Sequence, residues 1–273
     1  MALATAGFSL GIRPVVSLLP HEEVIAEHVD QLCAQITGEG FQRDPIIIDR
    51  ESATVLDGMH RLAAFRRLKI ENAVCCSVDY SSPAVAIGRW ARVYTMRKED
   101  SLTAALNGPV GLRRTPLAEA FSALQRREAA VAVLTTDAAF VSEGKRTVAD
   151  MAEAVLSFDR LAEGRGWARS FVPEDEVDVP LQQPHKFVVL PQCLTKDDVV
   201  TAARTGKLIP CKTSMHSIDP RPVAVNFPIS ELGKASSTKL RERLARTEGR
   251  LLPRGSDYGG RRYKERLLRL DGE

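Results

Sequence analysis

The stretch "TVLDGMHRLAAFRRL", residues 54–68, decides how the N-terminal part of the chain folds. Small and apolar residues run into Asp57 and Gly58, and a helical pattern with an apolar stripe follows at once. At the first turn of a helix the backbone N–H groups are unpaired, and the helix dipole has its positive end there. The stretch therefore predicts a strand, a tight turn and a helix, with a turn that is suited to an anion.

The residues of this turn have the chemistry of a phosphate-binding site. Gly58 lets a ligand approach the backbone, Arg61 carries a planar charged fork that suits phosphate oxygens, and His60 adds a hydrogen-bonding group. Asp57 is the odd member, because a carboxylate repels phosphate unless Mg²⁺ lies between them or it acts as a base. The alternative is structural, with Asp57 as the helix cap and the basic residues on the surface. Spacing alone gives the two interpretations about equal weight.

The flanking sequence alternates short strands with helices. In the N-terminal part, strands are predicted at residues 13–20, 45–49, 53–56 and 73–80, and helices at residues 22–40 and 59–70. Later in the chain, helices are predicted at residues 117–133, 148–158 and 195–206, and a strand at residues 186–191. The fold class is therefore α+β, with one domain over residues 1–95 and a second, mixed α/β domain over residues 96–273 that completes a cleft.

The composition limits the class of protein. The chain has 273 residues, of which 44% are hydrophobic and 27% charged, enough for one large domain or two smaller ones. Basic and acidic residues nearly balance, at 38 against 35, which argues against nucleic acid as a partner. The cationic stretch at residues 234–269 is typical of a solvated helical face.

Cysteine usage and the N-terminus indicate the compartment. The five cysteines show no CxxC spacing, which argues against a zinc site, and their odd number suits a reducing environment. The first twenty residues have neither a basic leader nor a long apolar run, so neither a signal peptide nor a membrane span is predicted. We therefore expect a cytoplasmic protein with no membrane partner.

Three stretches together resemble a known fold. "VLDGMHRLAAFRRLKI" at residues 55–70, preceded by "LLPHEEV" and "DPIIID", is similar to the ParB/sulfiredoxin-type fold. Within that group, Asp-Gly-x-His-Arg with an upstream His-Glu most resembles the free L-serine kinases. The resemblance is strongest over the first eighty or so residues and resumes at "GKLIPCKTSMHSIDPRP", residues 206–222. It implies an enzyme that uses Mg²⁺ and either ADP or ATP to convert free L-serine into O-phospho-L-serine.

The resemblance also implies a role for individual residues. Glu22 takes the place of the carboxylate that removes the proton from the serine hydroxyl, and Asp57 that of the acid in the phosphate motif. The residues implied to bind phosphate are Gly58, Met59, His60 and Arg61, and those implied to bind substrate are Lys212, Thr213, Ser214 and His216. No metal ligand is assigned. The structural alternative for Glu22 is an acid in the first turn of a helix, a place that Glu23 fits equally well.

The sequence departs from the family pattern at two positions, and two other functions have less support. Met59 replaces a polar residue of some members, and Met215 stands where a basic residue is expected, which puts the substrate in doubt more than the fold. Sulfinic acid reduction is disfavoured, because Gly58 and Met59 occupy the region of the sulfiredoxin cysteine. The alternative function is a ParB-like regulatory or DNA-binding protein without kinase activity, yet residues 117–133 show no clear basic recognition helix.

One C-terminal segment has two equally supported interpretations. The segment with Ser256, Tyr258, Arg261 and Arg262 is consistent with closure over a nucleotide and equally with a cationic face that binds a partner. Neither the preferred nucleotide nor the oligomeric state is indicated. The pathway that phosphoserine would enter is not indicated either.

Overall fold

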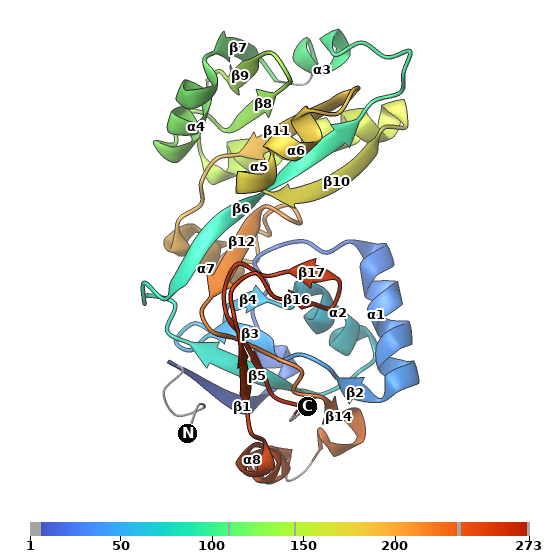
Figure 1. Cartoon of the computed structure of the whole chain (residues 1–273), viewed down its shortest axis with the longest axis vertical. Coiled ribbons are helices and arrows are strands. Elements are labelled where there is room, and N and C mark those ends of the chain that lie inside the picture. The colour runs from blue at the N-terminus through green and yellow to red at the C-terminus, as the bar shows by residue number, and fades with distance from the viewer. Residues whose placement is uncertain (1–6, 109, 145, 234–235, 272–273) are drawn as a thin grey trace. The chain divides into compact units, whose positions relative to one another are not determined.

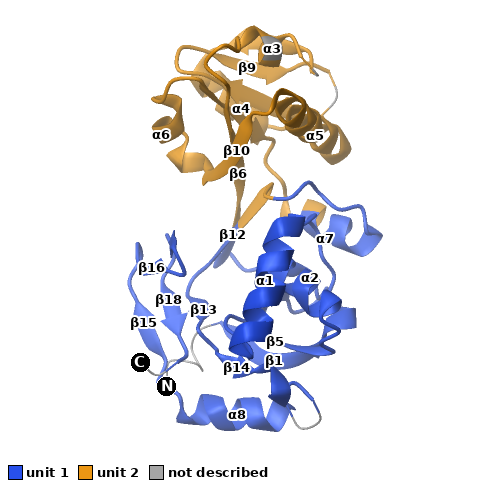
Figure 2. Ribbon diagram, turned by 90° about the vertical axis from the view of Figure 1, so that its right-hand side faces the viewer, with its two compact units in different colours: residues 1–86, 199–211, 216–273 blue, residues 87–198, 212–215 orange. Residues whose placement is uncertain are grey.

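The computed structural model describes residues 7–108, 110–144, 146–233 and 236–271. The chain forms two compact units, coloured separately in Figure 2. Unit 1 contains residues 1–86, 199–211 and 216–273, and unit 2 contains residues 87–198 and 212–215. Residues 216–273 thus belong to the same compact unit as the N-terminal residues, whereas most of the middle of the chain forms the other unit.

Unit 1 is organised around a four-stranded sheet in the order β1-β5-β3-β4 (Figure 1). Its strands are β1 (Phe8–Pro14), β3 (Ile46–Asp49), β4 (Val55–Asp57) and β5 (Asn72–Val78). Strand β3 pairs with β5 in parallel and with β4 in antiparallel orientation, and the helices α1 (Ala26–Glu39) and α2 (Met59–Arg67) contact each other. The three isoleucines of β3 are at most 2% exposed, as expected for a strand covered on both faces.

The C-terminal part of unit 1 forms small sheets. Strand β18 (Leu267–Arg269) pairs in parallel with β13 (Arg221–Val223) and in antiparallel orientation with β15 (Arg250–Leu252). The other elements are β2 (Phe41–Gln42), β14 (Phe227–Pro228), which pairs with β2, the hairpin strands β16 (Asp257–Tyr258) and β17 (Arg261–Arg262), and the helix α8 (Ser236–Arg246). Residues 234 and 235 of the cationic stretch lie outside the described residues.

Unit 2 is built on a seven-stranded sheet in the order β10-β6-β11-β8-β9-β7, with β12 paired to β6 outside this order. Its strands are β6 (Val85–Thr95), β7 (Leu112–Thr115), β8 (Val131–Leu134), β9 (Ala139–Ser142), β10 (Ala168–Pro173), β11 (Lys186–Pro191) and β12 (Ser214–Ile218). The helices are α3 (Thr103–Leu106), α4 (Leu117–Gln125), α5 (Val148–Arg165), α6 (Asp178–Leu181) and α7 (Lys196–Thr205). Three of these elements, β6, α7 and β12, run across the boundaries between the units along the chain.

The predicted α+β class is confirmed, and two predicted elements are corrected. The strand expected at residues 13–20 ends at Pro14, and residues Val15–Ser17 form a 3₁₀ turn because the Ser17 hydroxyl donates to the Pro14 carbonyl. The helix expected at residues 117–133 ends at Gln125, since Arg127 has φ 58° and Val131 already begins β8. Among the residues described, no helix combines the length and apolar character needed to cross a membrane.

Candidate functional site

The loop before α1 is fixed on both sides of Glu22. The His21 ring donates from Nδ1 to the Val55 carbonyl in β4 at 2.7 Å. Beyond Glu22, the Ile25 N–H donates to Nε2 of His60, in the first turn of α2, at 3.0 Å. Glu22 is therefore held between the strand and the helix that flank the Asp-Gly turn.

Glu22 itself is buried, whereas Glu23 is exposed. Only 8% of Glu22 is accessible, and its carboxylate lies 3.8 Å from Nε2 of His21. Helix α1 begins at Ala26 with Ile25 as its N-cap, and the acid in its first turn is Glu27. The structural alternative for Glu22, an acid in the first turn of the helix, is therefore wrong. The burial of the Glu22 carboxylate therefore needs another explanation.

The turn between β4 and α2 is made by Gly58. This residue is the N-cap of α2 and has φ 97° and ψ 27°, a left-handed conformation that favours glycine. Asp57 is the last residue of β4, and Gly58, the N-cap, has no side chain that could cap the helix. The alternative interpretation of Asp57 as the N-cap of the helix is therefore wrong.

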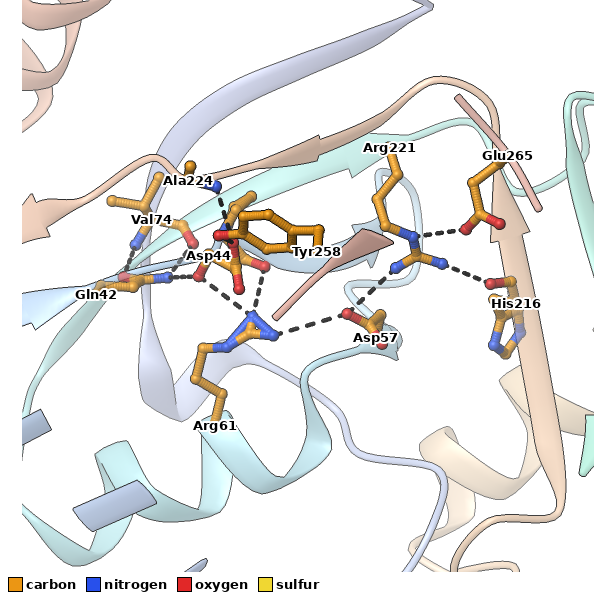
Figure 3. Close-up of polar contacts among 11 residues, drawn as sticks. Gln42, Asp44, Asp57, Arg61, Val74, His216, Arg221, Ala224, Tyr258 and Glu265 are labelled. Atoms are coloured by element: carbon orange, nitrogen blue, oxygen red, sulfur yellow. Dashed lines mark hydrogen bonds and ion pairs between the residues drawn. The ribbon is translucent and has the colours of Figure 1, made fainter. Parts of the chain in front are cut away.

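Asp57 lies between two guanidinium groups, as Figure 3 shows. Its Oδ2 is 3.7 Å from Nη2 of Arg61 and 3.3 Å from Nη1 of Arg221. Arg61 also donates from Nη1 to the Asp44 and Pro45 carbonyls at 3.2 and 2.9 Å. Two cations therefore compensate the carboxylate, so its charge does not by itself exclude a phosphate from this turn.

The other two residues of the predicted phosphate motif have restricted roles. The Nε2 atom of His60 accepts from the Ile25 N–H, so in the neutral ring only Nδ1 carries a proton. His60 thus links the loop that carries Glu22 to α2. Met59 is 9% exposed and begins α2, which leaves its backbone N–H as the group that could meet an anion.

The predicted substrate segment is divided between the units. Lys212, Thr213 and Ser214 belong to unit 2, and His216 belongs to unit 1. Within unit 2, Nζ of Lys212 lies 4.8 Å from the centre of the Trp90 ring, and the Thr213 carbonyl accepts from the Trp90 N–H at 3.1 Å. Thr213 and Ser214 are buried. The contact of this segment with substrate stays a prediction.

Two buried histidines, His21 and His216, and the buried Tyr80 contact one another in unit 1. The His21 and His216 rings meet edge to face at 5.5 Å between centroids, and Nε2 of His216 lies 2.7 Å from the Tyr80 hydroxyl. Burial lowers the pKa of His21, although nearby Glu22 acts in the opposite direction. Burial also lowers the pKa of His216, well below its usual range, and the neighbouring His21 adds to this. Both rings are therefore neutral at pH 7.

These depressed pKa values predict that the protein loses stability in mild acid. The unfolded chain takes up protons on His21 and His216 as the pH falls through 6.5, whereas the folded chain does not. The contribution of the two neutral histidines to the free energy of unfolding is thus complete above pH 6.5 and declines below it. Urea unfolding should show a free energy of unfolding lower by about 2 kcal/mol at about pH 5.5 than at about pH 7.5.

Variants separate this effect from general acid sensitivity. His216→Gln should remove about half of the pH dependence, whereas His185→Asn, at an exposed position, should leave it unchanged. If His216→Gln kept the full difference between the two pH values, other groups would have to be responsible.

Sequence reasoning missed Arg221, Glu265 and Tyr80 as parts of the site. Arg221 is 3% exposed, and Glu265 is 5% exposed and 2.7 Å from Nε of Arg221. In the sequence, Arg221 stands between two prolines and Glu265 lies in a run of cationic residues, where charged residues are usually solvated. No local signal marks either residue as buried. Within the described part of the chain, no group of three or more metal-binding side chains is found.

Among known proteins, the chain is similar to a ParB-like protein. No protein-family model matches the chain. A ParB-like protein of Sulfolobus acidocaldarius is 34% identical over 76 residues, which is 28% of this chain and 38% of that protein. The chain thus spans well under half of that relative in the match. Over the matched residues, the chain is thus similar to a ParB-like protein.

The more particular likeness is to serine kinases. The ADP-dependent L-serine kinase of Thermococcus kodakarensis is 24% identical over 232 residues, covering 78% of this chain and 88% of that enzyme. The ATP-dependent L-serine kinase of Staphylothermus marinus is 31% identical over 87 residues, covering 29% of this chain and 34% of that enzyme. A solved structure of a free serine kinase in complex with AMP superposes with a TM-score of 0.67 at 19% identity, covering 82% of this chain and 93% of that one. The predicted resemblance to the ParB-like free serine kinases is confirmed, and the chain has their fold.

Proposed function

We propose that this protein is a kinase that transfers a phosphoryl group from a nucleotide to the hydroxyl of free L-serine, giving O-phospho-L-serine. The observation that carries the proposal is the position of Glu22, a buried carboxylate in the loop that His21 and Ile25 hold between β4 and the N-terminus of α2. Similarity to an ADP-dependent L-serine kinase over 88% of that enzyme supports the same assignment.

The proposed mechanism assigns a task to each part of this site. The backbone N–H groups at the start of α2, opened by Gly58, hold phosphate oxygens at the positive end of the helix dipole. Glu22 orients the serine hydroxyl and accepts its proton as the oxygen attacks phosphorus. In a loose transition state this proton leaves late, so a carboxylate placed beside the hydroxyl is sufficient as its base. Asp57 keeps Arg61 and Arg221 in place at the same turn.

Mg²⁺ is part of the proposal. Phosphoryl transfer needs a cation that neutralises charge on the phosphates, and Mg²⁺ is usually held by phosphate oxygens and water with one or two carboxylates. The described residues form no ready cluster of three metal-binding side chains, which fits an ion that arrives with the nucleotide. A free amino acid and a nucleotide as substrates are consistent with a cytoplasmic enzyme of amino-acid biosynthesis.

A direct assay tests the function and the donor together. Purified protein is incubated with Mg²⁺, L-serine and either ADP or ATP, and phosphoserine and the shortened nucleotide are followed by mass spectrometry. Phosphoserine is expected with one of the two donors, and omission of L-serine should leave that nucleotide intact. L-threonine and L-homoserine are run in parallel to define the acceptor. Nucleotide binding without product from any of the three acceptors would contradict the proposal and favour a regulatory protein.

A further inference from the structure

Arg221 joins three parts of unit 1 that are distant in sequence. Its Nε donates to Glu265 at 2.7 Å, and its Nη2 donates to the His216 carbonyl at 2.6 Å. Its Nη1 lies 3.3 Å from Asp57 at the phosphate-binding turn. Figure 3 shows the guanidinium with each of its nitrogens turned toward one of these partners. A single side chain thus contacts the turn, the predicted substrate segment and the C-terminal segment.

The environment of Arg221 makes this arrangement costly to disturb. Burial by itself would lower the pKa of Arg221, but Asp57 and Glu265 outweigh it, and the pKa lies above its ordinary value. A buried ion pair adds little net stability, yet removal of one partner leaves an uncompensated charge inside the protein. A pair used only to hold the fold could be replaced by apolar residues. The third contact, with a carboxylate at the site, gives this pair a further use.

The C-terminal segment, residues 250–269, is attached to the site at two points. Beside Arg221, its β18 pairs with β13, and the Arg221 N–H donates to the Arg266 carbonyl at 2.9 Å. At the hairpin, the Tyr258 hydroxyl donates to Oδ1 of Asp44 at 2.8 Å, and the Asp44 carbonyl accepts from Arg61. The two guanidinium groups that flank Asp57 are therefore each connected to this one segment.

We propose that Arg221, held by Glu265, is a positioning residue that fixes the Asp57 carboxylate and the His216 backbone relative to each other, and that the C-terminal segment is thereby a required part of the phosphate-binding site. The catalytic side of this inference rests on the proposed kinase function. Its structural side, the coupling of residues 250–269 to the turn at residues 57–61, is independent of the reaction.

Kinetics separate a positioning role from a role in folding alone. Arg221→Lys keeps the charge but cannot meet three partners, and Arg221→Met removes the charge while keeping much of the volume. We expect kcat per folded molecule to fall about 10-fold in the lysine variant and about 100-fold in the methionine variant, with KM for serine within about threefold. Glu265→Gln should resemble Arg221→Lys. A merely structural role would lower the melting temperature and leave kcat per folded molecule unchanged, which would overturn the proposal.

A matched control lies in the same segment. Arg254 is exposed and pairs with Asp219, so Arg254→Gln should keep kcat within about twofold of the original protein. An equal loss in this variant would show that any charge change in the segment is harmful, and would overturn the specific role of Arg221.

Hydrogen exchange provides a readout that does not need the kinase reaction. In Arg221→Lys and Glu265→Gln, peptides covering residues 54–68 and 250–269 should exchange faster together, while the β8–β9 peptide at residues 131–142 stays unchanged. If the original protein made no phosphoserine but this joint change occurred, the kinase proposal would fail and the coupling would stand. Faster exchange in residues 250–269 alone would overturn the coupling.

Discussion

Glu22→Gln is expected to lower kcat for phosphoserine formation by about 10³-fold, with little change in the affinity for nucleotide. The amide has nearly the same shape as the buried carboxylate, so the loop at residues 19–25 keeps its place between β4 and α2. It cannot accept the proton of the serine hydroxyl, and general-base catalysis typically contributes 10²–10⁴-fold. Initial rates at saturating substrate, with nucleotide binding measured by calorimetry, test both parts of the expectation.

Glu23→Gln is the matched control for this variant. Glu23 is adjacent in sequence but exposed, so the same chemical change there should leave kcat within about twofold. If Glu22→Gln kept more than about a tenth of the activity, Glu22 would not be the base, and its burial would need another reason.

The local parts of the site could be predicted from the sequence. The β4–α2 turn is predicted by a short apolar strand, the pair Asp57-Gly58 and the periodic helix that follows. Gly58 has φ 97°, a left-handed backbone conformation that favours glycine. The apolar run of β3 and the alternation of strands and helices likewise indicate the α+β class. These features depend on neighbouring residues, which is why pattern and propensity were sufficient. The predicted contacts of Glu22 and Asp57 with substrate stay predictions.

The long-range contacts could not be predicted in this way. Arg221 meets Asp57 across 164 positions of the sequence, the difference between their residue numbers, and Glu265 lies a further 44 positions on. Periodicity carries no information on such pairings, because a buried arginine and an exposed one look alike in sequence. The same limit explains His60, whose side chain accepts from the Ile25 N–H and thereby holds the loop of Glu22. In a single sequence, polar residues that support a site cannot be distinguished from those on the surface.

Asp57→Asn is expected to separate nucleotide affinity from turnover. The change removes a negative charge that lies 3.7 Å from Arg61 and 3.3 Å from Arg221, and so leaves more positive charge at the turn. We expect nucleotide to bind several-fold more tightly, because a repulsive carboxylate is gone, and kcat to fall about 100-fold, because both guanidinium groups lose the partner that holds them. Calorimetric titration with ADP and with ATP, together with saturation kinetics, measures the two effects separately.

The control for Asp57→Asn is Asp30→Asn, which removes an exposed acid of α1 that pairs with the exposed Arg67. This variant should change neither nucleotide affinity nor kcat beyond about twofold, because a surface ion pair contributes little. If Asp57→Asn weakened nucleotide binding instead, the carboxylate would be an attractive contact for the ligand and not only an anchor for the two arginines. An unchanged kcat in the same variant would show that Asp57 has no role in turnover. We expect tighter binding together with slower turnover because the Asp57 carboxylate has two opposing effects. Its negative charge repels the phosphates, and its contacts hold in place the two guanidinium groups that bind them.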